Sequence, residues 1–431
     1  MSVVRGFPAL PSLLTSSKIK ALAEEPGAPG STYMTPANHP ERLPFARKPR
    51  SPGGRIVVTG QVGVDKKPFL EQVVRIAAEH GHDVLLCNVG DMMYAEAPDV
   101  VPGRILDLPL GRLNSLRRAV FKDILGKIHQ HSHVIVNTHA TFRWRHGLFP
   151  AFDHDQMLQL DPDIFVTLVE NVDAVHERLT REHREVQHSL KDVLVWREEE
   201  ILATEILATI IRGWGRFFVL ARGQSTRRPA ESFYRLMFEP HRIKVYPSFP
   251  MTHVMDMPET LAEIDAFRAL LAEHFVTFDP GDVDEKNLLI KAVAHQKKGE
   301  TRIQVDVGGR PVTFELDEIL SVAGDIDGQI YARDFKLIEQ SDMIVSYIPA
   351  GPDGRPIISS GVERELQHAH ESTKEVYVIW RSGAEPSPFV TETATRVFPT
   401  AAQAVQYFQR VGYMGDVQMD LHEPPAPGLL F

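Results

Sequence analysis

The chain has 431 residues, more than one hydrophobic core usually supports, so two domains are expected. A hydrophobic share of 43% and a charged share of 24% are ordinary for a globular protein and argue against a disordered or fibrous chain. The formal net charge of −10 argues against a duplex nucleic acid partner and favours a small nucleoside or nucleotide.

A single cysteine, Cys87, excludes an intramolecular disulfide and a zinc site built from cysteines, and it favours a reducing, cytoplasmic location. No apolar run approaches the roughly 18 residues that span a bilayer, so no membrane segment is predicted. Residues 1–54 are rich in Pro, Ser and Gly and are expected to form a flexible arm.

From residue 55 onward, short β-branched runs alternate with segments of helical spacing, which predicts a parallel sheet. Predicted strands lie at 55–59, 83–88, 133–138, 164–170 and 217–221, and predicted helices lie at 69–80, 112–130 and 198–213. Residues 223–229 have the composition of a linker, so the domains are predicted at 55–230 and 231–431.

The alternation restarts in the second domain. Strands are predicted at 243–246, 275–278, 342–348 and 376–380, helices at 258–274 and 363–370, and a hairpin at 302–316 that turns at Gly308 and Gly309. The predicted fold class is α/β, with two three-layer domains whose sheets are mainly parallel.

The loop after the first strand has the register of a phosphate-binding P-loop, with Gly60, Gly63 and Lys66 in the matching positions. Two positions depart from the motif. Asp65 replaces its second glycine, and Lys67 replaces the Ser or Thr that holds Mg²⁺. A plain strand-to-helix turn remains the alternative to a phosphate site.

The first domain resembles archaeal-type adenylate kinases in four segments that occur in order, at 87–97, 134–141, 147–152 and 160–170. The resemblance implies ATP or another nucleotide as ligand, Arg104 as a residue that binds the nucleoside monophosphate, and Arg178 and Arg184 as residues around the transferring phosphates. Solvated arginines on helix faces are the alternative. Asn137 stands where the family has an aspartate, so we expect a degenerate kinase domain with no predicted metal ligands and leave Mg²⁺ binding open.

Residues 331–348 and 360–369 resemble nucleoside 2-deoxyribosyltransferases, and Asp334, Asp342, Gly361 and Glu365 match the positions of that motif. The resemblance implies that Asp334 opens a helix and is the general acid/base, and that Glu365 near a helix start is the nucleophile, kept ionised by the helix dipole. Asp342 would order the site or touch the ligand. The alternatives are an exposed helix glutamate for Glu365 and a helix N-cap for Asp334.

Phe249, in the loop after the first strand of this domain, is a candidate for stacking on a nucleobase, or a core residue. Ser360 and Gly361 are candidates for binding a phosphate at a helix entrance, or for capping. The resemblance also implies a homo-oligomer. The predicted function is an N-glycosidase or 2-deoxyribosyltransferase with a nucleotide-sensing kinase-like domain. The alternatives are an active nucleoside monophosphate kinase and a scaffold without catalysis.

Overall fold

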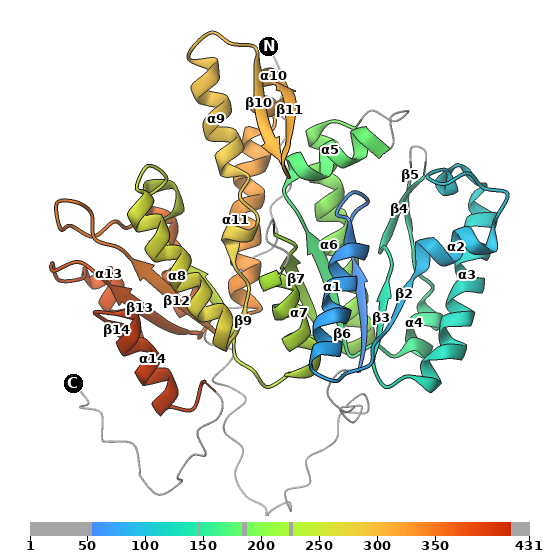
Figure 1. The fold of residues 1–431 in the computed structure, drawn as a ribbon, viewed down its shortest axis with the longest axis horizontal. Coiled ribbons are helices and arrows are strands. Elements are labelled where there is room, and N and C mark those ends of the chain that lie inside the picture. The colour runs from blue at the N-terminus through green and yellow to red at the C-terminus, as the bar shows by residue number, and fades with distance from the viewer. Residues whose placement is uncertain (1–53, 145–146, 183–187, 224–226, 415–431) are drawn as a thin grey trace, which may run out of the picture. The chain divides into compact units, whose positions relative to one another are not determined.

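The computed structural model describes residues 54–144, 147–182, 188–223 and 227–414. The predicted arm at 1–54, except for Gly54, lies outside these residues, and so does Arg184. Figure 1 shows an α/β fold with two mainly parallel sheets, which confirms the predicted fold class.

The first sheet has the strand order β2-β3-β1-β6-β7, and all of its strands are parallel. The strands are apolar because helices cover both faces of the sheet, and β6 is buried along its whole length. The strands are β1 (Arg55–Thr59), β2 (Leu85–Asn88), β3 (Val134–Asn137), β6 (Ile164–Val169) and β7 (Phe217–Ala221). The helices are α1 (Lys66–Glu79), α2 (Val89–Glu96), α3 (Leu110–Lys127), α4 (His154–Leu160), α5 (Val172–Glu182) and α6 (Leu190–Arg212).

The second sheet has the order β14-β13-β12-β8-β9 and is also parallel. Counted along the chain this is the order 2-1-3-4-5, so the direction of winding reverses between β8 and β12. The strands are β8 (Lys244–Ser248), β9 (Val276–Thr277), β12 (Met343–Ile348), β13 (Glu375–Trp380) and β14 (Arg396–Phe398). The helices are α8 (Pro258–His274), α9 (Lys286–Gln296), α10 (Leu316–Ser321), α11 (Ala323–Glu339), α12 (Ser360–Glu371), α13 (Pro388–Thr391) and α14 (Ala401–Arg410).

Two antiparallel hairpins stand outside the sheets. One, β4 (Thr141–Trp144) with β5 (Gly147–Pro150), follows β3 in the first domain. The other, β10 (Arg302–Val307) with β11 (Arg310–Glu315), has the predicted turn at Gly308 and Gly309, and its β10 contacts α9 and also α5 of the first domain. The insertion in the second domain therefore reaches back to the first.

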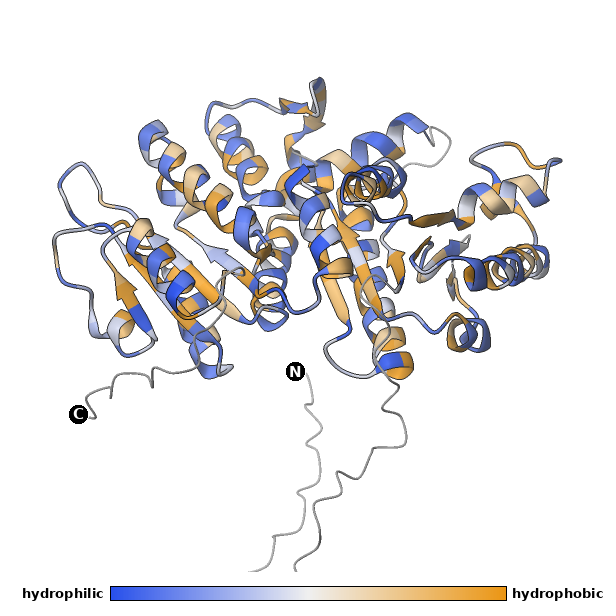
Figure 2. Ribbon diagram, turned by 60° about the horizontal axis from the view of Figure 1, so that its bottom comes forward, coloured by the Kyte–Doolittle hydropathy of each residue, from blue (hydrophilic) through white to orange (hydrophobic). Residues whose placement is uncertain are grey.

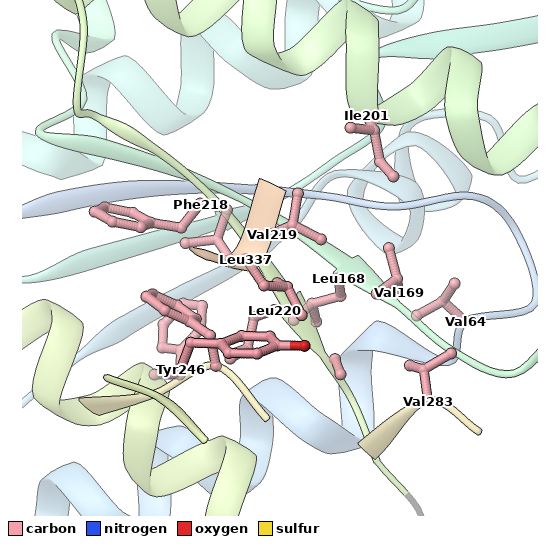
Figure 3. Packing of buried hydrophobic residues seen from close by; sticks show 14 of the residues in the cluster. Val64, Leu168, Val169, Ile201, Phe218, Val219, Leu220, Tyr246, Val283 and Leu337 are labelled. Atoms are coloured by element: carbon pink, nitrogen blue, oxygen red, sulfur yellow. The ribbon is translucent and has the colours of Figure 1, made fainter. Parts of the chain in front are cut away.

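One hydrophobic cluster runs through both domains. It contains residues of β1, β6 and β7 together with residues of β8, β12 and α11. Figure 3 shows Val219 and Leu220 of β7 close to Leu337 of α11 and Tyr246 of β8. The ring of Phe218 also stacks on that of Phe278, with centroids 5.8 Å apart. In Figure 2 the strands are mainly hydrophobic and the outer helix faces mainly hydrophilic, which is the pattern of packed layers.

The segment predicted as a linker is in part helical. Residues Arg227–Phe238 form α7, which packs against α1 of the first domain and against β9 of the second. The predicted boundary at residue 230 therefore falls inside a helix that contacts both sheets. Apolar residues such as Phe233 bury one face of α7, and the sequence around Pro229 hid this amphipathic pattern.

Candidate functional site

The P-loop joins β1 to α1 and has left-handed backbone at three positions. Gly60 has a φ of 140°, Gly63 a φ of 88°, and Asp65 adopts the left-handed conformation with a φ of 60°. A Cβ at Gly60 would lie 2.7 Å from the carbonyl oxygen of Leu168. The glycine at position 60 is thus required by close packing on β6 as well as by backbone conformation.

Lys66 is turned back into its own loop. Its Nζ donates a hydrogen bond of 2.5 Å to the carbonyl oxygen of Gly60 and lies 3.4 Å from Nδ1 of His139. Burial lowers the pKa of Lys66 to about 8, although the charge of Glu200 opposes this shift. The ammonium group is therefore satisfied inside the protein.

Glu200 of α6 is the buried carboxylate of this loop. It accepts hydrogen bonds from the backbone N–H groups of Ala140 (2.8 Å), Thr141 (3.0 Å) and Gly60 (3.3 Å) and from the hydroxyl of Thr141 (2.6 Å). Although burial opposes ionisation, His139, Lys66 and Thr141 hold its pKa at about 2. An ionised carboxylate thus lies beside Gly60, the first glycine of the loop.

The residues at the Mg²⁺ positions do not fit that ion. The ammonium group of Lys67 pairs with Asp91 at 2.7 Å, and the amide of Asn137 donates to the side chain of Asn88 at 2.8 Å. Within the described part of the chain, no group of three or more His, Cys, Asp or Glu side chains is arranged to hold a metal ion.

Arg178 binds the loop itself. It donates to the carbonyl oxygen of Gly63 at 2.6 Å and pairs with Glu170 at 3.2 Å. Arg222 also pairs with Glu170 (2.7 Å) and reaches the carboxylate of Asp65 at 3.3 Å. Asp65 is therefore compensated by an arginine. Arg104 lies before the short helix η2 (Ile105–Asp107) and pairs with Asp107 at 2.8 Å.

The second domain contains a cavity of about 540 Å³ at the carboxyl end of its sheet. It lies where the winding reverses between β8 and β12, which is the ligand position in open α/β sheets. Among the candidate residues, it is lined by Phe249, Asp334, Ser360, Gly361 and Glu365. The structure thus brings five of the candidate residues, from three segments of the chain, to one cavity. Their roles stay predictions.

Glu365 lies in the second turn of α12 and is held by two hydroxyl groups of β8. Its Oε2 accepts from Ser248 at 2.6 Å, and its Oε1 accepts from Tyr246 at 3.1 Å. Ser346 of β12 in turn donates to Ser248 at 3.2 Å. The carboxyl group is therefore oriented by side chains from the two strands at the switch point.

Asp334 lies inside α11 and does not open a helix, because that helix begins eleven residues earlier at Ala323. Its Oδ1 is 3.8 Å from Nε of Arg333, an ion pair without a hydrogen bond. Burial raises the pKa of Asp334 to about 6, which Arg333 opposes and Glu285 reinforces.

The two carboxyl groups titrate apart. Burial and the charge of Asp334 raise the pKa of Glu365 to about 8, although Ser248 and Tyr246 act in the opposite direction. The expected ionisation of Glu365 by the helix dipole is thus outweighed by burial. Asp334 ionises first, and its charge then opposes ionisation of Glu365. At neutral pH the two groups together therefore hold one proton, mainly on Glu365.

Phe249 is buried against the cavity, and the guanidinium group of Arg268 lies 5.5 Å from the centre of its ring. Ser359, one residue before Ser360, caps α12 by accepting from the backbone N–H of Val362 at 3.1 Å. Asp342, in contrast, does not line the cavity. It accepts from the backbone N–H of Lys244 at 2.8 Å, at the start of β12 and β8, and the parallel strands separate that edge from the cavity.

Several residues of both sites escaped sequence reasoning. Tyr246 ends the strand predicted at 243–246, and Ser248 follows it as the last residue of β8, so their place at the carboxyl edge is the available signal. His139 lies within a motif that was singled out for other residues. Glu200 sits in a run of helix glutamates, and nothing in that run distinguishes the buried one.

Comparison with known proteins agrees with the fold of the first domain. Residues 59–194 match the model of the AAA domain family, less than half of the chain. Over these residues the first domain is similar to the AAA domain family, in line with its parallel sheet. No curated protein matches the chain.

Solved structures with some similarity include a gluconokinase and two shikimate kinases. A gluconokinase from Sinorhizobium meliloti 1021 is 17% identical over 44% of this chain and 97% of its own, with a TM-score of 0.29. A shikimate kinase from Bacteroides thetaiotaomicron is 14% identical over 44% and 98%, with a TM-score of 0.29, and one from Acinetobacter baumannii, in complex with shikimate, is 10% identical over 44% and 94%, with a TM-score of 0.31. Such values are too low to indicate a shared substrate.

No helix in the described ranges is long and apolar enough to cross a membrane.

Proposed function

We propose that the second domain cleaves or transfers the N-glycosidic bond of a nucleoside or nucleotide, with Asp334 and Glu365 as the reacting pair. The observation that carries this proposal is the placement of two carboxyl groups with separated pKa values, about 6 and about 8, on one cavity. Paired carboxyl groups of this kind are what glycosidic chemistry needs. The resemblance to nucleoside 2-deoxyribosyltransferases supports the same assignment.

The one-proton form of the pair is the active form. Transfer of the proton from Glu365 to Asp334 crosses about two pKa units, an uphill step of about 3 kcal/mol. The Glu365 carboxylate then attacks the anomeric carbon as the bond to the base breaks, and the leaving base takes its proton from Asp334. The product of this step is a glycosyl ester on Glu365.

The second step regenerates the pair. The Asp334 carboxylate accepts a proton from a water molecule, or from the nitrogen of an incoming base, as this nucleophile attacks the anomeric carbon. The bond between that carbon and Glu365 breaks, and Glu365 leaves as a carboxylate while Asp334 is protonated. Water gives hydrolysis and a second base gives transfer. The hydroxyl groups of Ser248 and Tyr246 stabilise the departing carboxylate.

The experiment is release of free base from nucleosides and nucleoside 5′-monophosphates, ribo and deoxy, with and without ATP. Glu365→Gln should abolish release while the protein stays folded, and Glu363→Gln, an exposed glutamate on the same helix, should leave release unchanged. Base release that survives Glu365→Gln, or no release from any member of the panel, would overturn the proposal.

A second candidate function is phosphoryl transfer by the first domain, favoured by the AAA domain match at residues 59–194. The inward-turned Lys66 and the lysine at position 67 count against it, and we propose that this domain binds or senses a nucleotide. Robust Mg²⁺-dependent transfer of phosphate from ATP to AMP by the purified protein would decide for the kinase.

A further inference from the structure

Arg197 connects the two domains at a buried point. It belongs to α6 of the first domain, is 5% exposed, and its two terminal amino groups donate to both carboxylate oxygens of Glu285, at 2.6 and 3.1 Å. It also donates to the side chain of Gln329 of α11 at 2.6 Å. A bidentate arginine of this kind fixes both the distance and the orientation of its partner.

Glu285 lines the 540 Å³ cavity and connects Arg197 to Arg333. Its Oε2 accepts from Arg333 at 3.3 Å, while the other amino group of Arg333 donates to the carbonyl oxygen of Val283 at 3.0 Å. Arg333 is thereby fixed with its Nε 3.8 Å from Asp334. A series of polar contacts thus runs from Arg197 of α6 through the buried Glu285 and Arg333 to the half-buried Asp334.

We propose that Arg197 of the P-loop domain is a positioning residue for the acid pair, because it holds Glu285, and through it Arg333, against Asp334. The catalytic role of Asp334 and Glu365 rests on the proposed function. The effect of Arg197, Glu285 and Arg333 on the position and protonation of Asp334 does not depend on that function. A side chain of the first domain therefore holds Glu285, which lines the cavity of the second. Arg197 does not line the cavity and contacts no reacting atom, so its effect is exerted through Glu285.

The charges that face Asp334 come from every element around it: Arg333 on its own helix, Glu285 before α9, Glu365 on α12 and the hydroxyl of Tyr246 on β8. Arg197 compensates the charge of Glu285. Without Arg197, Arg333 is the remaining arginine against the Glu285 carboxylate and is drawn more strongly to it, so the carboxyl group of Asp334 should hold its proton to higher pH.

Four variants test the proposal. Arg197→Met removes the charge, and Arg197→Lys keeps the charge without the bidentate geometry. Because Arg197→Met removes one of the two arginines that neutralise the buried Glu285 and can prevent folding, the double variant Arg197→Met/Glu285→Gln removes both charges. Arg212→Met is the matched control, an arginine of the same helix that pairs with Asp161 at 3.0 Å within the first domain.

The primary measurement is the titration of the Asp334 carboxyl carbon by NMR in full-length protein labelled with ¹³C aspartate, assigned with Asp334→Asn. We expect the midpoint to rise by about one pH unit in Arg197→Met, to stay between wild type and this value in Arg197→Lys, and to fall below wild type in the double variant. The Arg212→Met midpoint should equal that of wild type. Midpoints in the folded Arg197 variants that match the Arg212→Met control would overturn the proposal.

Base release supplies the second measurement. The acidic limb of the pH profile should move in the same direction as the Asp334 midpoint, and kcat should fall by about tenfold with little change in KM, as expected when the position of a reacting group is disturbed. If wild type releases no base, the proposed function fails while the carboxyl titration still decides the role of Arg197. If base is released and the acidic limb stays fixed in all Arg197 variants, the positioning role is overturned.

Discussion

The hydroxyl group of Ser248 donates a hydrogen bond of 2.6 Å to Oε2 of Glu365, and this bond ties the carboxyl end of β8 to the second turn of α12. A hydrogen bond to an ionised carboxylate favours the charged form, so Ser248 lowers the pKa of Glu365 against the effect of burial. The serine thus makes it easier for the proposed nucleophile to lose its proton, although burial has the larger effect.

The substitution Ser248→Ala should therefore raise the pKa of Glu365 above about 8 and move the alkaline limb of base release to higher pH. We expect kcat at neutral pH to fall by about tenfold, since one charge-assisted hydrogen bond contributes about 1.5 kcal/mol or more. Ser341→Ala, a buried serine at the opposite edge of the sheet, should leave the profile unchanged. An alkaline limb that stays in place in Ser248→Ala would contradict the prediction.

The pH profile of the wild-type protein should be bell-shaped. Only the form with one shared proton is active, and it is populated between the two pKa values of the pair, about 6 and about 8. Base release per second, measured at saturating substrate from pH 4.5 to 9.5, should therefore be highest near pH 7. A plateau that continues unchanged below pH 5 or above pH 9 would exclude the shared-proton mechanism.

Glu365 also makes a prediction about stability that does not depend on activity. Its pKa is raised in the folded state, so the folded protein binds this proton more tightly than the unfolded chain does. The carboxyl group therefore lowers the free energy of unfolding as pH rises from about 4 to about 8, by at most about 1.4 kcal/mol for each unit of the shift.

Glu365→Gln removes this penalty, so we expect a higher Tm than wild type at pH 9 and a difference close to zero at pH 4. Differential scanning calorimetry at both pH values measures it. Glu363→Gln, on the exposed side of the same helix, should show no such pH dependence. A Tm difference for Glu365→Gln that is the same at pH 4 and pH 9 would show that the group titrates normally.

The elements that sequence predicted well are those whose pattern is set by local burial. The strand at 55–59 and the helix at 258–274 have the predicted bounds, since one is a continuous β-branched run and the other begins with a proline and keeps apolar spacing. The second sheet was predicted for the same reason. By contrast, α7 and α11 were missed, because each lies between two domains and carries apolar or polar contacts toward both.

The candidate site could likewise be predicted only in the part that depends on local sequence. Motif spacing placed Asp334 and Glu365, and the chain order of strands and helices then brought them to one cavity. The pKa values could not be predicted, because they depend on burial and on charges from distant segments such as Glu285. Likewise, Glu200 lies 140 residues from Gly60 in sequence, and only the packing of α6 shows that it meets the P-loop.

Glu200 predicts how the first domain responds to ATP. Its carboxylate, with a pKa of about 2, stays ionised beside Gly60 and repels phosphate groups. Glu200→Gln should tighten ATP binding by about tenfold, measured by titration calorimetry at pH 6.5, where Lys66 stays protonated. The variant should also lose about 3 kcal/mol of stability, because the buried pair with His139 is broken and the hydrogen bonds to the carboxylate are weakened.

Glu199→Gln provides the comparison for this experiment. Glu199 is the preceding residue of α6 and pairs with Arg143, outside the Lys66 network. Its neutral variant should bind ATP with wild-type affinity. Equal affinities of the two variants would mean that the Glu200 carboxylate does not oppose phosphate at this loop.

The contacts of Gln340, which directly follows α11, lead us to expect that the two domains unfold together. Its side-chain oxygen accepts from the backbone N–H of Val219 at 2.8 Å, and its amide donates to the carbonyl oxygen of Val219 at 2.7 Å. Val219 lies on β7, the edge strand of the first sheet, so this side chain of the second domain takes the place of a neighbouring strand. Gln340→Leu leaves both backbone groups without these partners and should cost about 1–3 kcal/mol.

Because the hydrophobic cluster is continuous across β7, α11 and β8, the loss should appear as a lower midpoint of one cooperative transition in urea, with an unchanged slope, by both circular dichroism and tryptophan fluorescence. Gln367→Leu, which removes an exposed pair with Glu371 on α12, should shift the midpoint far less. Two separate transitions in the wild-type protein would show that the shared core does not couple the domains, since one sheet would then unfold while the other stays folded.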